Sequence, residues 1–156
     1  MILLFALALL QEIGGTKPPA VGQVLVATEK SHDPDLARSV ILVIHADGDG
    51  VMGLILNRPR DQTIYFGGPI ALGARALFRS RAKPPDAEHI VGDVYLVSKE
   101  SSIPKDANAR VYAGYVGWSA QQLSGEIARG LWKIVRGDAA MVFDPHPESL
   151  WRRNVR

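Results

Sequence analysis

Two apolar runs near the middle of the chain constrain its fold more than any other feature. Residues 39–45 (SVILVIH) and 51–57 (VMGLILN) are both rich in branched aliphatic side chains, which favour buried β-strands. Only residues 46–50 (ADGDG) separate them, and Asp and Gly are typical of tight connections. The pattern predicts a hairpin whose first strand is buried on both faces, so the domain should be organised around a sheet.

Other patterns predict further strands and two short helices. A mixture of Ala, Leu and Arg over residues 71–83 favours a short helix, and Pro147 can open a last helix that carries Trp151. A short apolar patch at residues 64–66 ends at a Gly-Gly-Pro turn. Strands are predicted over residues 23–28, 89–97, 110–115, 131–135 and 139–143.

Residues 119–129 carry the best-defined helix signal. Ser119 can cap the helix and Gln122 stands three residues on, the spacing of a capping box. Leu123 and Ile127 then share one face. Because strands outnumber helices and several are neighbours in sequence, we predict an α+β fold. It should be a single compact domain with a mixed, largely antiparallel sheet, barrel-like in its curvature, and a few helices.

Composition narrows the class of protein without naming a reaction. The 156 residues suffice for one domain, and 47% hydrophobic with 22% charged residues is the profile of a globular protein. The chain has no cysteine, which excludes disulfides, thiolate catalysis and cysteine-based zinc sites. The net charge of +2 permits an anionic partner but does not argue for one.

The N-terminus leaves the location of the protein open. Residues 1–22 are predicted to be an apolar extension and linker that precede a domain of residues 23–156. The apolar run of residues 1–10 has the length of a signal-peptide core, but no Lys or Arg precedes it. Both an exported protein and one that keeps this extension therefore remain possible readings of the sequence.

Four blocks together resemble the YqgE/AlgH family of small bacterial proteins, and they occur in the family's order. They are residues 33–40, 50–59 and 66–70, and Gly114-Tyr115-x-Gly117-Trp118 with the following stretch to Trp132. The resemblance implies an α+β fold, a cytoplasmic location and a role as a transcriptional regulator. It implies no cofactor and no catalytic residue. Only six residues separate Pro59 from Phe66, where the family has a longer, helix-bearing segment, so this chain resembles a shortened member.

The block residues are predicted to form one binding surface of a non-enzymatic regulatory protein. Its partner would be another protein or a small anion, the latter if Arg38, Arg58 and the glycine turn converge. Residues 45–49 could instead offer imidazole and carboxylates to a metal, but turn chemistry accounts for them and we predict no metal site. The surface residues are Arg38, Asn57, Arg58, Gly67, Gly68, Tyr115, Trp118 and Gln122.

A hydrolase is the first alternative. Residues 117–121 (GWSAQ) nearly match the nucleophile motif G-x-S-x-G around Ser119, and Asp138 or Asp144 followed by His146 would complete a Ser…Asp…His order. The last motif position is glutamine, where the crowded turn needs a small residue. The capping role of Ser119 explains the same residue at lower cost.

Direct nucleic-acid binding is the second alternative. The densest basic cluster lies in residues 75–83, and Arg75 and Arg79 would share a face of the predicted helix. Basic clusters that include an aromatic residue such as Phe78 can bind nucleic acid. No helix-turn-helix or other DNA-reading motif accompanies the cluster. The cluster consists of Arg75, Arg79, Arg81 and Lys83.

Overall fold

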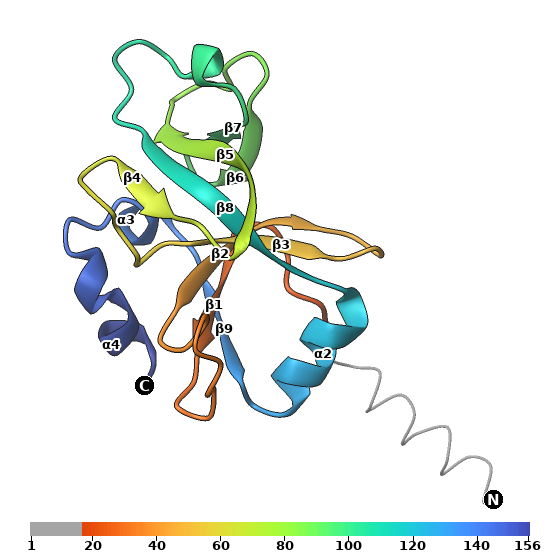
Figure 1. Ribbon diagram of the computed structural model, residues 1–156. Helices are drawn as coiled ribbons and strands as arrows, with labels where there is room; N and C mark the ends of the chain where they lie inside the picture. The colour runs from red at the N-terminus through yellow and green to blue at the C-terminus, as the bar shows by residue number, and fades with distance from the viewer. Residues whose placement is uncertain (1–16) are drawn as a thin grey trace, which may run out of the picture.

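The computed structural model describes residues 17–156, which form a curled, nine-stranded sheet with a few short helices (Figure 1). Residues 1–16 lie outside the described part, and with them the apolar run on which the export hypothesis depends. Within residues 17–156, no helix is both long and apolar enough to cross a membrane.

The strands follow the order β6-β7-β5-β8-β3-β2-β1-β9 across the sheet, and β4 pairs with β8. The pairings are antiparallel except that of β4 with β8, which is parallel. The strands are β1 (Gln23–Ala27), β2 (Val40–Ala46), β3 (Val51–Ile55), β4 (Ile64–Phe66), β5 (Ile70–Arg79), β6 (Glu88–Val91), β7 (Val94–Val97), β8 (Arg110–Trp118) and β9 (Trp132–Arg136).

The sheet curls until its two ends approach each other. Gly22, immediately before β1, accepts the N–H of Gly137, just after β9, at 3.2 Å, and a Cβ atom on Gly22 would lie 2.7 Å from the carbonyl oxygen of Ile90 in β6. The predicted α+β class with a mixed, largely antiparallel and barrel-like sheet is confirmed, as a half-barrel.

Helices cover the sheet at a few places only. They are η1 (Glu100–Ser102), α2 (Ala120–Ala128), α3 (Ala139–Val142), η2 (Pro147–Ser149) and α4 (Leu150–Asn154). The predicted capped helix is confirmed as α2, where the Ser119 hydroxyl accepts the backbone N–H of Gln122 at 3.1 Å. The helix that Pro147 opens is confirmed as η2 and α4, and α4 carries Trp151.

The helix predicted over residues 71–83 is wrong, because β5 occupies most of this segment. Ala76, Leu77 and Phe78 are all buried, and β5 is paired with β7 on one side and with β8 on the other. Alanine, leucine and arginine favour helices in isolation, but pairing with two distant strands outweighs that preference.

Two further predictions are corrected. The strand predicted over residues 139–143 is wrong, because residues 139–142 form the short helix α3. The Asp138 carboxylate accepts the backbone N–H of Met141 at 2.8 Å and caps this helix. The strand predicted over residues 89–97 is a hairpin of β6 and β7. Gly92, with φ of 55°, makes the turn between them.

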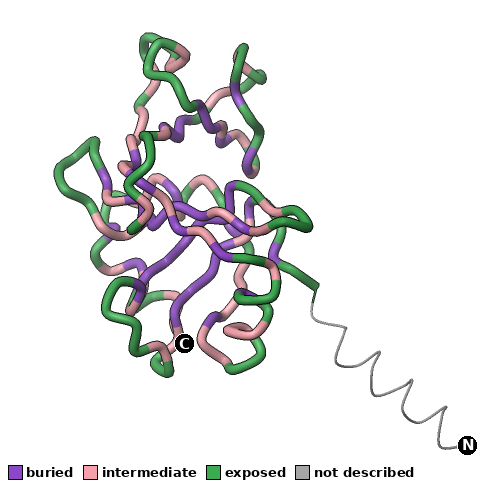
Figure 2. The backbone as a smooth tube through the Cα atoms, turned by 45° about the vertical axis from the view of Figure 1, so that its right-hand side comes forward, coloured by how far each residue is buried: buried purple, intermediate pink, exposed green. Residues whose placement is uncertain are grey.

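The hairpin of β2 and β3 lies in the middle of the core, as predicted. Successive residues of β2 point to opposite faces of the sheet, and both faces are covered, so Val40 to Ile44 are all buried. Leu123 of α2 packs on one face, whereas Val142 and Leu150 of α3 and α4 pack on the other. The buried stretches accordingly meet in the centre of the molecule (Figure 2).

Candidate functional site

Strand β8 brings the sequence blocks together. It pairs with β5 along one edge and with β4 and then β3 along the other. At Gly114 the backbone has a positive φ of 74°, and a Cβ atom there would lie 2.5 Å from the Gly68 carbonyl oxygen. Only glycine combines this conformation with such a close approach, so the block around Gly68 is fixed against the block around Gly114.

Gly67 and Gly68 serve this same backbone contact. A Cβ atom on Gly67 would overlap the Gly114 carbonyl, and one on Gly68 would overlap the Tyr115 backbone. The Gly67 N–H donates to the Ala113 carbonyl at 2.7 Å. Both glycines are buried, so their position is explained by the close packing of two chain segments.

Asn57 and Arg58 hold the loop before β2. The Asn57 side chain accepts the N–H of Val40 and donates to the Arg38 carbonyl, both at 2.9 Å. Arg58 donates from its two terminal nitrogens, to the carbonyl of Asp35 and, at 3.1 Å, to that of Ala37. Its guanidinium is thus engaged by the chain itself, and burial lowers its pKa from the ordinary value.

The remaining predicted side chains differ in burial and in contacts. The Arg38 guanidinium sits over the Trp151 ring, 5.5 Å from its centroid, and the residue has φ of 60°. Trp118 is only 6% exposed and meets Trp132 edge to face at 5.7 Å, so its ring belongs to the core. Gln122 is exposed in the first turn of α2. Arg38, Arg58 and the glycine turn each have contacts within the chain, and an anion site among them stays a prediction.

Tyr115 is the predicted residue that combines partial exposure with a cavity. It lines an open cleft of about 290 Å³ beside the β2–β3 turn, here called the hairpin cleft. Three of the four sequence blocks contribute to its walls. The lining residues are His45, Asp47, Asp49, Gly50, Val51, Met52, Ile70, Tyr115, Gly117 and Trp118.

The rim of the hairpin cleft is acidic. The Asp47 carboxylate accepts the N–H groups of Asp49 and Gly50 at 2.8 and 3.1 Å, and it lies 2.7 Å from Nε2 of His45. The Asp49 N–H foremost, then the His45 ring and the Gly50 N–H, lower the pKa of Asp47. Among residues 17–156, no three His, Asp or Glu side chains gather as a metal site would require. The loop is therefore a hydrogen-bonded turn that places negative charge at the cleft.

Beside the hairpin cleft, β5 bulges outward. Ile70 pairs with Tyr115 and Ala74 with Ala113, so three residues of β5 lie opposite one residue of β8. Leu72, in this bulge, is 66% exposed. Sequence reasoning missed Leu72, because a bulge becomes visible only when the strand register is known.

Arg75 follows the bulge and covers the aromatic residue of the cleft. Its guanidinium lies 4.9 Å from the centroid of the Tyr115 ring. Within the described chain, Arg75 forms no ion pair and donates no side-chain hydrogen bond. The sequence cluster of residues 75–83 is thereby divided, since Arg79 pairs with Asp93 at 2.9 Å on the other half of β5.

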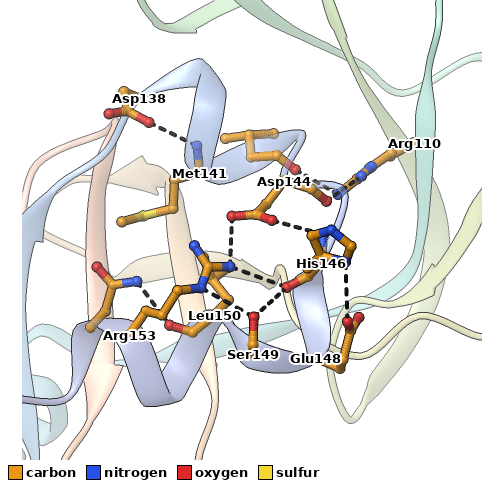
Figure 3. Close-up of polar contacts among 11 residues, drawn as sticks. Arg110, Asp138, Met141, Asp144, His146, Glu148, Ser149, Leu150 and Arg153 are labelled. Atoms are coloured by element: carbon orange, nitrogen blue, oxygen red, sulfur yellow. Dashed lines mark hydrogen bonds and ion pairs between the residues drawn. The ribbon is translucent and has the colours of Figure 1, made fainter.

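The groups of the hydrolase hypothesis do not form a triad. Asp144 accepts the backbone N–H of His146 at 2.8 Å and is paired with Arg153 at 2.7 Å, while the His146 ring faces Glu148 (Figure 3). Burial raises the pKa of Asp144, but the His146 N–H and Arg153 outweigh it, and the net pKa is lowered. Ser119 lies at the start of α2, on the opposite side of the molecule from α3 and α4 (Figure 1).

The matches to known proteins agree with this architecture. The model of the AlgH-like family matches residues 24–156, which is most of the chain. This chain belongs to the AlgH-like family. A UPF0301 protein of Streptomyces coelicolor is 30% identical over 163 residues, which covers 86% of this chain and 84% of the relative. One from Methylococcus capsulatus is 31% identical and covers 86% and 89%.

Two solved structures share the fold. A protein from Corynebacterium diphtheriae superposes with a TM-score of 0.74 at 22% identity, covering 90% of this chain and 89% of that one. The solution structure of AlgH from Pseudomonas aeruginosa has a TM-score of 0.70 at 23% identity, covering 90% and 91%. At these identities the likeness extends to the fold alone.

Proposed function

We propose that this AlgH-like protein is a non-enzymatic regulatory protein that binds another protein through the hairpin cleft and the adjoining β5 bulge. One observation carries this proposal. Three sequence blocks supply walls of the same open cleft, and Leu72, which is 66% exposed, follows the lining residue Ile70 by two positions. An apolar centre with a charged rim is the usual anatomy of a protein interface.

The chemistry of the surface favours a partner with basic side chains. Asp47 and Asp49 give the rim negative charge, which would steer and orient a complementary patch. Tyr115 and Arg75 are already stacked, so little side-chain freedom remains to be lost on binding. Tyrosine and arginine are also the residue types on which interface affinity most often depends.

The contacts of the basic side chains on β5 favour a regulatory role through protein binding over direct DNA binding. Arg79 is paired with Asp93, and the Arg75 guanidinium lies over the Tyr115 ring, so these two arginines are not presented together as one basic surface. We propose that any effect on transcription passes through a protein partner. We also propose a cytoplasmic location, as the resemblance to the family implies, and cell fractionation with the full chain would test it.

Site-specific photo-crosslinking in cells of the source organism tests the surface. Leu72 is replaced by p-benzoylphenylalanine, and exposed Glu29, which lies beside Lys30 and Arg156, is replaced in a matched control. We expect one protein adduct from position 72 that is absent from position 29 and is lost when Asp49→Lys is added. Equal adducts from both positions, or indifference to the charge reversal, would contradict the proposal.

A gel-retardation titration with DNA tests the alternative hypothesis of direct DNA binding. Direct binding would weaken steeply with added salt and with Arg81→Glu and Lys83→Glu. We expect no retardation of promoter fragments at physiological salt. Retardation that those two substitutions abolish would replace the protein partner with DNA.

A further inference from the structure

A second cavity lies on β5 beyond Arg75, between β4 and the segment that joins β7 to η1. It encloses about 470 Å³, within the range of small-molecule sites. We call it the β4–β5 cavity. Its walls are largely apolar and come from Ile64, Ala74, Ala76, Val97, Ile103 and Val111.

The short segment between β3 and β4 forms part of the wall of this cavity, through Asp61 and Thr63. Residues 60–63 form a turn in which the Asp61 carboxylate accepts the N–H groups of Thr63 and Ile64, each at 2.7 Å. These bonds, that of Ile64 foremost, lower the pKa of Asp61. Ile64 is left 40% exposed at the rim. An apolar side chain at the mouth of an apolar cavity offers a surface on which a ligand can be buried.

Arg75 is the polar group that distinguishes this cavity. It is half-buried, lines the wall, and is held in place by the Tyr115 ring. Its nitrogen donors meet no carboxylate among the described residues. The other charged lining residues are Asp61, Lys99 and Glu100, and all three are exposed. Solvent screens exposed charges, so the half-buried Arg75 is the charge that a ligand inside the cavity would meet.

We propose that the β4–β5 cavity binds an amphipathic carboxylic acid. The carboxylate would pair with Arg75, whose planar fork of N–H donors matches two carboxylate oxygens. The apolar body would lie against Ile64, Val97 and Ile103. A cationic ligand would be repelled by Arg75.

The chemical probe is octanoate, added to the ¹⁵N-labelled full chain and followed by NMR. We expect saturable shifts of the backbone amides of Ala74, Ala76 and Lys99. Over the series from butanoate to octanoate, each methylene that is buried should tighten binding roughly fourfold. Octanol and octylammonium, equal in apolar length, should bind at least tenfold more weakly.

Two variants separate charge recognition from folding. Arg75→Gln should weaken octanoate binding by roughly tenfold or more. The matched control Arg79→Gln lies on the same strand but belongs to the pair with Asp93, and it should bind octanoate like the wild type. Ile64→Trp, which fills the mouth without touching the charge, should also abolish binding. It therefore serves as the test if Arg75→Gln loses its amide dispersion.

Three results would overturn the assignment. One is octanol binding as tightly as octanoate, another is shifts that map to the hairpin cleft instead of the β4–β5 cavity, and the third is no shift with any probe at millimolar concentration. The hairpin cleft and the β4–β5 cavity have no lining residue in common. A failure here therefore leaves the crosslinking result from position 72 unaffected.

Discussion

Two arginines of this protein lie over tyrosine rings at nearly the same distance. They differ in whether their guanidinium N–H groups also donate hydrogen bonds. Arg110, at one end of β8, sits 5.0 Å from the Tyr65 centroid, and Arg75 sits 4.9 Å from that of Tyr115. Arg110 also donates to the carbonyls of Val142 and Asp144, at 3.0 and 2.7 Å (Figure 3). Arg75 makes no such bond with the described residues.

The difference separates a structural arginine from one that is available to a partner. Arg110 ties the beginning of β8 to the C-terminal segment, and its fork is filled by carbonyls that would otherwise lack a donor. Arg75 gains only the attraction of the ring. Stacking on an aromatic ring therefore does not reveal the role of an arginine. Whether its N–H groups donate hydrogen bonds within the protein does.

The largest loss of stability should come from disturbing the close backbone contact between Gly68 and Tyr115 of β8. In Gly68→Ala, the new methyl group would overlap the Tyr115 backbone, and we expect a loss of about 3 kcal/mol in the free energy of unfolding. Urea denaturation followed by circular dichroism measures it. Gly48→Ala is the control, since nothing lies within 4 Å of that position. Equal stability of the two variants would refute the proposed close packing.

The next effect should come from Arg110. Arg110→Ala removes both hydrogen bonds to the C-terminal segment, and we expect a loss of about 2 kcal/mol because two partly buried carbonyls lose their donors. Hydrogen exchange should show faster exchange in α3 and α4 than in α2. A uniform change over all three helices would argue against a clamp on the C-terminal segment.

The C-terminal segment also predicts a dependence on pH. The folded-state pKa of Asp144 is lowered, so its stabilisation is present above the unfolded carboxyl value of about 4 and is lost as the pH falls through the lower folded value. We expect roughly 1 kcal/mol, because the Arg153 partner is half exposed. Unfolding free energies at pH 7 and pH 3 should differ by less in Asp144→Asn. A wild-type difference that this variant leaves unchanged would assign the effect to other carboxyl groups.

Local signals account for what could be predicted from the sequence. Ser119 and Gln122 are three residues apart and need no distant partner to define a helix start. The β2–β3 hairpin is likewise specified by two apolar runs and the turn between them. The helix predicted over residues 71–83 failed because the partners that make it a strand, β7 and β8, come later in the chain.

Less of the candidate site could be predicted from the sequence, because partners that are distant in the chain decide the role of each residue. Asn57 and Arg58 were placed on a binding surface, but their hydrogen-bond partners are backbone groups about twenty residues earlier in the chain. Whether Arg75 is paired or free depends on the strand register of β5, and the exposure of Leu72 depends on its bulge. Long-range pairing, which a single sequence does not display, decided each of these roles.

The smallest effect on stability should come from Arg75. Arg75→Ala removes a half-exposed stacking contact without leaving a carbonyl unsatisfied, so we expect a loss of about 0.5 kcal/mol. Its urea midpoint should lie close to that of the wild type, while Arg110→Ala unfolds at a clearly lower concentration. If both variants lost the same stability, Arg75 would be a structural residue like Arg110, and its donors would not be available to a ligand. A stable Arg75→Ala that no longer binds octanoate would instead place the two stacked arginines in different roles.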